Sequence, residues 1–154
     1  FQPLALFEEF KGFSTDENVN PNYIIPKQFM FRLQKLMDEY VGGAGSNFAT
    51  NEASLTRGAE LLGFLKEDSE KLAARDLYEL LRVWENKHRL WQAEAHLRAV
   101  EFRKETRWPG YYFRTDYPTL DEENWLCFVN MKVDPATNEW SVFKRPIINM
   151  FGVE

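Results

Sequence analysis

Little in this sequence points to disulfides, a bound cluster or a membrane. The 154 residues include one cysteine and two histidines. Cys127 alone forms no disulfide within the chain and cannot supply the four thiolates that a cubane iron–sulfur cluster requires. No apolar run approaches the roughly 20 residues that span a bilayer, and no signal peptide is visible. We therefore expect a cytoplasmic protein without membrane insertion.

The chain also lacks an excess of basic residues, with 19 Lys and Arg against 24 Asp and Glu. The formal net charge is −5 and the isoelectric point is about 5.2. Affinity for nucleic acid comes largely from Lys and Arg side chains that neutralise phosphates, so this balance argues against a nucleic-acid partner. Hydrophobic residues make up 44% of the chain and aromatic residues 16%, which is enough to build the core of one globular domain.

The N-terminal half of the sequence predicts two helices. Apolar residues at helical spacing begin at Pro26, a good first residue of a helix, and stop at two consecutive glycines, 42 and 43. A second helix is expected to start at Thr50 or Asn51 and to end near Leu72. Gly58 and Gly63 weaken this helix unless close packing requires their small size.

A third, longer helix is predicted from Ala73 to Arg107, because that stretch contains neither glycine nor proline. Its length would be roughly 35 residues. One apolar seam at steps of three and four comprises Leu77, Leu81, Trp84, His88, Trp91, Ala95 and Phe102. A second row comprises Leu80, Val83, Leu90 and Leu97. Two apolar rows predict a helix sandwiched between two layers.

The C-terminal part predicts a β-hairpin. Two runs rich in β-branched and aromatic residues flank the turn residues 134–138. Alternation places Cys127, Val129 and Met131 on one side with Trp125, and Leu126 and Phe128 on the other, and we expect both faces to be covered.

The fold class is therefore mainly α: a bundle of about three helices with a long central helix, followed by an aromatic loop and a C-terminal β-hairpin. We treat residues 1–154 as a single domain. Within it, residues 1–25 lead in, residues 26–107 form the bundle, and residues 108–154 form the loop and hairpin.

The first residues suggest a piece of a longer polypeptide. The chain starts with Phe1 rather than Met, and Leu6, Phe7, Phe10 and Phe13 already share one helical face.

The usual catalytic and cofactor motifs are weak here. His88 and His96 are eight residues apart, which leaves them about 80° apart around a helix, whereas paired metal ligands use a spacing of three or four. We interpret both as core or hydrogen-bonded histidines. The string "VGGAGSN" (41–47) follows a helix rather than a strand and lacks Gly-Lys-Ser/Thr, so we interpret it as a flexible connection. Cys127 is interpreted as a structural thiol. We expect no catalytic, cofactor-binding or metal-binding residue in this chain.

The segment around residue 108 is the one candidate site. It comprises Arg103, Arg107, Trp108, Tyr111, Tyr112 and Arg114. On one interpretation its aromatic rings anchor the hairpin to the helices. On the other, the three arginines face an anionic group or a carboxylate of a neighbouring domain. The two interpretations are compatible, and we treat all six residues as interface candidates.

Two strings carry a resemblance to a known family. They are "RKETRWPGYYFRTDYP" (103–118) and "NVNPNYIIPKQFMFRLQKLMDEYVGG" (18–43). Both resemble the C-terminal helical domain of the flavoprotein (alpha) subunits of dissimilatory adenylylsulfate reductases, and the resemblance covers nearly the whole chain. More distantly, the first string resembles the succinate dehydrogenase and fumarate reductase flavoproteins. In those proteins the matching stretch reads Arg-x-Glu-Ser-Arg-Gly-Ala-His-x-Arg-x-Asp-x-Pro. The corresponding residues of this chain are Arg103, Glu105, Thr106, Arg107, Arg114, Asp116 and Pro118.

One departure separates the chain from that wider group. Residues 108–112 replace Gly-Ala-His and add two positions, which weighs against a dicarboxylate substrate. The resemblance implies a domain of a heterodimeric cytoplasmic enzyme that interconverts adenylylsulfate with sulfite and AMP. It further implies FAD in an upstream flavin domain of the same chain and two [4Fe-4S] clusters in a small beta subunit. The alternative from another class is a free-standing helical interaction module that docks through the aromatic loop.

Overall fold

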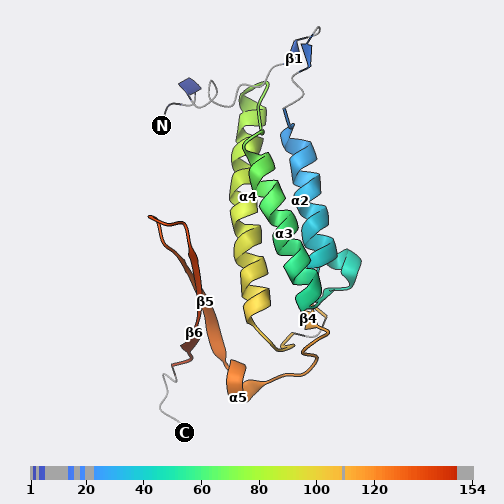
Figure 1. The fold of residues 1–154 in the computed structure, drawn as a ribbon, viewed down its shortest axis with the longest axis vertical. Helices are drawn as coiled ribbons and strands as arrows, with labels where there is room; N and C mark the ends of the chain where they lie inside the picture. Colours follow the sequence, from blue (N-terminus) through green and yellow to red (C-terminus); the bar gives the residue numbers. More distant parts are fainter. Residues whose placement is uncertain are drawn as a thin grey trace.

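Among the described residues, three long antiparallel helices and a β-hairpin beside the last of them form the main body (Figure 1). The structure is a computed structural model that describes residues 2, 4–5, 14–15, 18–19, 23–108 and 110–148. The helices are α2 (Pro26–Tyr40), α3 (Glu52–Ser69) and α4 (Leu77–Phe102). This arrangement confirms the predicted mainly α fold. The predicted helical face of Leu6, Phe7, Phe10 and Phe13 lies outside the described residues.

Short elements connect the helices. β1 (Ser14–Thr15) pairs antiparallel with β2 (Asn18–Val19), and the 3-10 turn η1 (Ala44–Ser46) follows α2. β3 (Ala49–Thr50) pairs in parallel with β4 (Phe113–Arg114), and α5 (Glu122–Trp125) precedes the hairpin. The β3–β4 pair ties the segment after α4 to the start of α3.

Helix α2 begins and ends, and helix α3 begins, where local chemistry predicts; α3 ends at Ser69, a little before the expected Leu72. Pro26 opens α2, and Gly42, just beyond its end, has a φ of 93° that favours glycine. Asn51 is the N-cap of α3, and its side chain accepts a hydrogen bond from Ser54 N at 2.9 Å. Gly58 lies close to α2 and α4, because a Cβ there would stand 3.1 Å from Tyr40 Cβ and 3.4 Å from a Leu97 methyl. Its small size is therefore used in packing.

The third helix is shorter than predicted. It has 26 residues because the stretch before it is held in another conformation: Ala73 N donates to Ile24 O, and Ile24 N donates to Lys71 O at 2.9 Å. The Asp76 side chain then accepts a hydrogen bond from Glu79 N at 2.8 Å and starts the helix. At the other end, Arg103 is extended, with φ −81° and ψ 111°.

The core face of α4 is the second predicted row and not the first. Leu80, Val83, Leu90 and Leu97 are buried in the core with α2 and α3, whereas Leu77 and Leu81, near the upper end of α4, are each more than half exposed. The prediction of two covered layers is therefore wrong for the upper half of the helix within the described residues. Both rows satisfy the helical period, and the choice between them is made by the other helices.

The hairpin is confirmed, with seven paired positions between β5 (Cys127–Val133) and β6 (Trp140–Pro146). Cys127, Val129 and Met131 lie on its partly buried side. The opposite face is exposed, contrary to prediction: Leu126 and Phe128 each keep 54% of their surface. The correction has a simple cause, since a two-stranded ribbon lying on one helix can cover only one of its faces.

Candidate functional site

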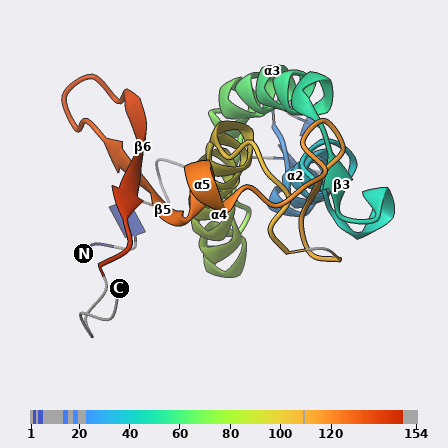
Figure 2. The ribbon, with the colours of Figure 1, turned by 90° about the horizontal axis from the view of Figure 1, so that it is seen from below.

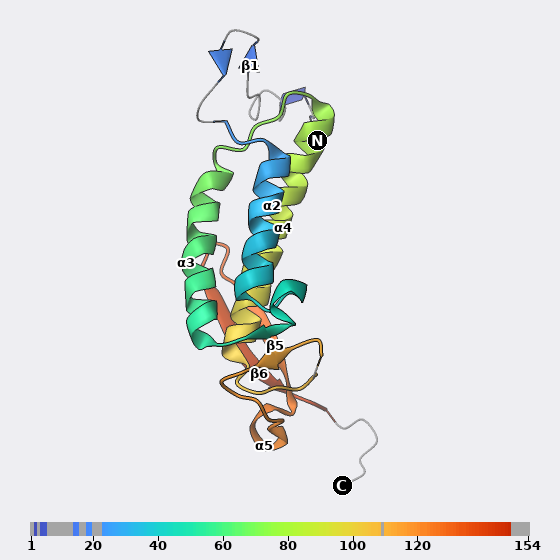
Figure 3. The same ribbon diagram turned by 90° about the vertical axis from the view of Figure 1, so that its right-hand side faces the viewer.

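The candidate segment lies across the lower end of the bundle. Figures 2 and 3 show residues after α4 passing beneath the ends of all three helices before the chain reaches α5. This end of the bundle contains the C-termini of α2 and α4 and the N-terminus of α3. Helix ends carry unpaired backbone groups, and the segment meets them there.

Arg114 caps the C-terminus of α4. Its side chain is 0% exposed, and its Nη1 donates to Val100 O at 2.7 Å and, at longer range, to Glu101 O and Arg103 O. These carbonyls belong to the last turn of α4 and the residue after it, where a cation is favourable. The last turn of α4 has no basic residue of its own, so Arg114 supplies the missing charge.

Asp116 connects this cap to the next helix. Its two carboxylate oxygens accept hydrogen bonds from Arg114 Nε at 2.8 Å and Nη2 at 2.6 Å. Oδ2 also accepts from Glu52 N, the first residue of α3, at 2.9 Å. Hydrogen bonding from Arg114 holds the pKa of the Asp116 carboxyl below its ordinary value. One ion pair thus joins the C-terminus of α4 to the N-terminus of α3.

Glu105 is the second buried acid of the segment. It is 0% exposed and pairs with Arg103 and Arg107 on either side, with Arg107 Nε at 2.7 Å. It also accepts from Asp121 N at 3.1 Å. Arg103 donates further to Trp125 O and Cys127 O, at 3.0 and 2.7 Å. This cluster fixes the start of the hairpin to the end of α4.

The charge state of Glu105 follows from these contacts. Burial by itself raises the pKa of the carboxyl, but hydrogen bonds from Arg107, from Asp121 N and from Arg103 outweigh it. The pKa therefore lies below its ordinary value. Glu105 is a carboxylate at neutral pH and balances two neighbouring guanidinium groups.

The arginines do not form the outward cationic face that the sequence suggested. Arg114 is fully buried, and the side chains of Arg103 and Arg107 are 17% and 18% exposed. Their donors bind acids and carbonyls of the same chain, which is the physical reason for the correction. Of the aromatic residues, Tyr112 is the anchor: its hydroxyl donates to Val100 O or Arg103 O, each at 3.1 Å.

Two other aromatic residues point away from the bundle. Trp108 is 67% exposed and Tyr111 is 83% exposed. Both belong to a tight turn in which Tyr111 N and Tyr112 N donate to Trp108 O, and Gly110 has a φ of 90°. Phe48 lies beside them, with its ring 6.5 Å from that of Tyr111. We call Phe48, Trp108 and Tyr111 the aromatic tip.

Phe48 is a residue that the sequence did not single out. Its φ is 57°, a left-handed conformation that is uncommon for an aromatic residue and costs on the order of 1 kcal/mol. Its backbone pairs with two segments, since Phe48 N donates to Gly43 O and Phe48 O accepts from Phe113 N. Tertiary pairing selects this conformation, and no local sequence signal predicts it.

The glycine-rich connection is closed on itself rather than flexible, because Asp38 Oδ1 accepts from Gly45 N at 2.8 Å and Ser46 Oγ donates to Asp38 O. The backbone N–H of Gly45, which a phosphate would have to bind, already donates to a carboxylate of the same chain. His88 and His96 are exposed rather than in the core. In the part of the chain that the structure describes, no group of three His, Cys, Asp or Glu residues is placed to hold a metal ion.

Across the described residues, no helix combines the length and apolar character needed to cross a bilayer.

The class of protein to which this bundle and hairpin belong follows from a comparison with known families. The sequence model of the family described as fumarate reductase flavoprotein C-term matches residues 31–151. The chain belongs to this family.

Within that class, the chain is similar to adenylylsulfate reductases. It is 52% identical over 146 residues to adenylylsulfate reductase subunit alpha of Megalodesulfovibrio gigas, a match that covers 95% of this chain and 22% of that protein. The adenylylsulfate reductase structure from Archaeoglobus fulgidus matches with a TM-score of 0.86 and 55% identity, over 99% of this chain and 24% of that one.

A more distant structure shares the fold. Quinol fumarate reductase from E. coli matches with a TM-score of 0.71 and 17% identity, over 99% of this chain and 24% of that one. The chain thus spans less than a quarter of the length of these proteins. The matches support the hypothesis of a domain within a longer flavoprotein subunit over that of a free-standing module.

The capping role of Arg114 can be tested by a substitution that keeps the positive charge. Arg114→Lys keeps the charge but cannot hold both Asp116 oxygens and the carbonyls of α4 at once. We expect the free energy of unfolding to fall by about 2–3 kcal/mol, measured by urea unfolding of this chain. Arg57→Lys is the matched control: that arginine pairs with Glu60 on the exposed side of α3, and the change should cost less than about 0.5 kcal/mol. Equal effects of the two substitutions would refute the capping role.

The Glu105 cluster predicts a pH dependence of stability. Because its pKa is lower in the folded chain, the unfolded chain binds more protons at acid pH. The stabilisation is present above the ordinary Glu pKa of about 4.3 and is lost as pH falls through the folded-state value. We expect Glu105→Gln to lower the free energy of unfolding at pH 7 by about 3 kcal/mol and to flatten its decline between about pH 5 and pH 3.

The measurement is urea unfolding followed by tryptophan fluorescence at several pH values. Glu123→Gln, at an exposed position of α5, is the control for the loss of one carboxylate charge. If Glu105→Gln keeps both the wild-type stability and the wild-type pH slope, Glu105 is not the buried anion described above.

Proposed function

We propose that this chain is the C-terminal structural and interface domain of an adenylylsulfate reductase alpha subunit. The full enzyme is the FAD oxidoreductase of dissimilatory sulfur metabolism that interconverts adenylylsulfate with sulfite and AMP. The observation that carries the proposal is identity above 50% to such reductases across nearly the whole chain. We propose that residues 1–154 act as one domain in a cytoplasmic heterodimer.

The chemistry of this chain suits a supporting role. FAD-binding folds of the dinucleotide type use Gly-x-Gly-x-x-Gly between a strand and a helix, whereas the glycines at 42–45 follow a helix and enclose Asp38. With one cysteine, the chain cannot supply the thiolates of a [4Fe-4S] cluster. These residues do not fit either group. We propose that the flavin is bound by an upstream domain of the same polypeptide and the clusters by an iron–sulfur beta subunit.

The six interface candidates divide into two roles in this proposal. Arg103, Arg107, Arg114 and Tyr112 hold the segment rigid against the helix ends. Trp108 and Tyr111, with Phe48, present apolar surface on that rigid base. Exposed Trp and Tyr on a fixed support are typical of the anchors of protein interfaces. We propose that the aromatic tip docks against the flavin domain or the iron–sulfur subunit.

The activity is tested on the full-length subunit produced together with its partner. We expect bound flavin, AMP- and sulfite-dependent reduction of an artificial electron acceptor, and no reduction of fumarate. The replacement of Gly-Ala-His by residues 108–112 is the reason to expect discrimination against a dicarboxylate. Fumarate turnover without adenylylsulfate chemistry would assign the subunit to the other branch of its family.

The aromatic tip is tested in the same heterodimer. Both residues are mostly solvent-exposed, so Trp108→Ala combined with Tyr111→Ala should leave the fold of this domain intact. It should weaken either subunit association or flavin retention by at least about tenfold, the scale of an interface hot spot. Subunit affinity and flavin absorbance show which neighbour is contacted. Phe64→Ala, at an isolated exposed position on α3 (58% exposed), is the control. Wild-type assembly and flavin content with turnover alone lost would make the tip catalytic instead.

A further inference from the structure

An apolar stripe runs along α4 beside the row that forms the core, and its member Trp84 is partly buried and also packs against the core. The stripe contains the seven residues of the first predicted row, which recur at steps of four and three from Leu77 to Ala95 and again, seven residues further on, at Phe102. Leu77, Leu81 and Trp91 are 55%, 54% and 55% exposed, and Trp84 and His88 pack edge to face between them at 5.9 Å. Exposed apolar residues on α2 and α3, such as Phe31 and Phe64, do not form such a row. A contiguous apolar surface on a folded chain marks a site of association.

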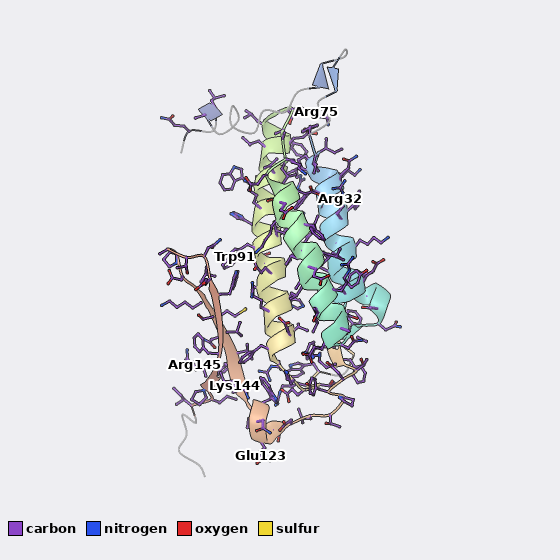
Figure 4. The ribbon with its side chains drawn as sticks, viewed as in Figure 1. Arg32, Arg75, Trp91, Glu123, Lys144 and Arg145 are labelled. Atoms are coloured by element: carbon purple, nitrogen blue, oxygen red, sulfur yellow. The ribbon has the colours of Figure 1, made fainter. Side chains whose placement is uncertain are left out.

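The lower half of the stripe already serves as a packing surface. The Trp91 ring lies 5.2 Å from that of Trp140 in β6, and the Phe102 ring lies 5.7 Å from that of Trp125 in α5. Figure 4 shows Trp91 on the side of α4 that faces the hairpin. The upper half, from Leu77 to His88, continues the same stripe toward the N-terminus of α4.

We propose that the upper half of this stripe binds an amphipathic helix from the remainder of the same subunit. The inference rests on the proposed function, because it treats the chain as one domain of a longer flavoprotein subunit. Three observations support it. The stripe is continuous with a surface that this chain itself covers. The matched adenylylsulfate reductases extend far beyond the matched region, which is 22–24% of their length. Finally, alternating steps of four and three are the pattern by which one helix packs on another at about 20°.

The occupant is identified by photo-crosslinking in the complete heterodimer. The variant Leu81→p-benzoylphenylalanine places a photoreactive ring in the middle of the exposed stripe, and the second variant Tyr78→p-benzoylphenylalanine replaces a neighbouring exposed ring of similar shape. After irradiation, we expect both to crosslink within the same polypeptide to a peptide upstream of Phe1. The matched control Phe31→p-benzoylphenylalanine, at a position 54% exposed on α2, should give at least tenfold less of that product.

Every other product overturns the inference. A crosslink to residues 1–25 would show that the leading segment of this chain covers the stripe. A crosslink of doubled subunit mass would assign the surface to a second copy, and one to the beta subunit would make it an intersubunit contact. Yields equal to the Phe31 control at both positions would show an uncovered surface. Flavin absorbance and turnover, measured on the same preparation, test the proposed function separately, since either can be normal whichever peptide is captured.

Discussion

The ion pair between Arg114 and Asp116 is the interaction on which the lower end of the molecule depends. Its cation meets the carbonyls that end α4, and its anion meets the N–H group that starts α3. Each charge therefore complements the dipole of the helix that it touches. A buried ion pair offsets the cost of desolvation only when its remaining donors and acceptors are also bound, and here Arg114 uses donors on both sides of its guanidinium group. The relative position of two helix ends is set by one planar contact.

That arrangement places polar groups inside and aromatic groups outside at the same end of the bundle. Guanidinium groups are suited to the interior of this segment because it contains many carbonyl oxygens and two carboxylates. Trp108 and Tyr111 lie on the outside of a segment that these hydrogen bonds hold in place. A rigid support lowers the entropy lost when exposed rings are covered by another surface. In the proposed function, the interior network holds the segment in place and the exposed tip provides the surface that docks.

Sequence patterns predicted much of this architecture, and the failures have physical causes. Pro26, Asn51 and the glycines after Tyr40 carry local signals, so both ends of α2 and the start of α3 could be predicted. The length of α4 was overestimated at both ends, because Ala73 pairs with Ile24 before the helix starts and Arg103 is already extended after it ends. Its core face was misassigned because two apolar rows satisfy one period, and only the packing of other helices chooses between them.

The candidate site shows the same division between local and tertiary information. Position 103–114 was identifiable from its composition, and the acids two residues from Arg103 and Arg114 were visible in the sequence. The inward direction of the arginines was not, since it depends on where the ends of α3 and α4 meet. Phe48 carried no signal at all, because its conformation is imposed by pairing with residues 43 and 113.

The late position of Arg114 in the chain has a consequence for how the domain acquires its structure during synthesis. The final turn of α4 is translated before the residue that caps it, and it has no basic side chain of its own to serve meanwhile. Its terminal carbonyls must therefore remain hydrated until the following segment has emerged and folded back beneath the bundle. Capping of the helix and ordering of the segment that carries Trp108 and Tyr111 are in this way one event rather than two, and a nascent chain that stops short of Asp116 lacks the ion pair that joins them.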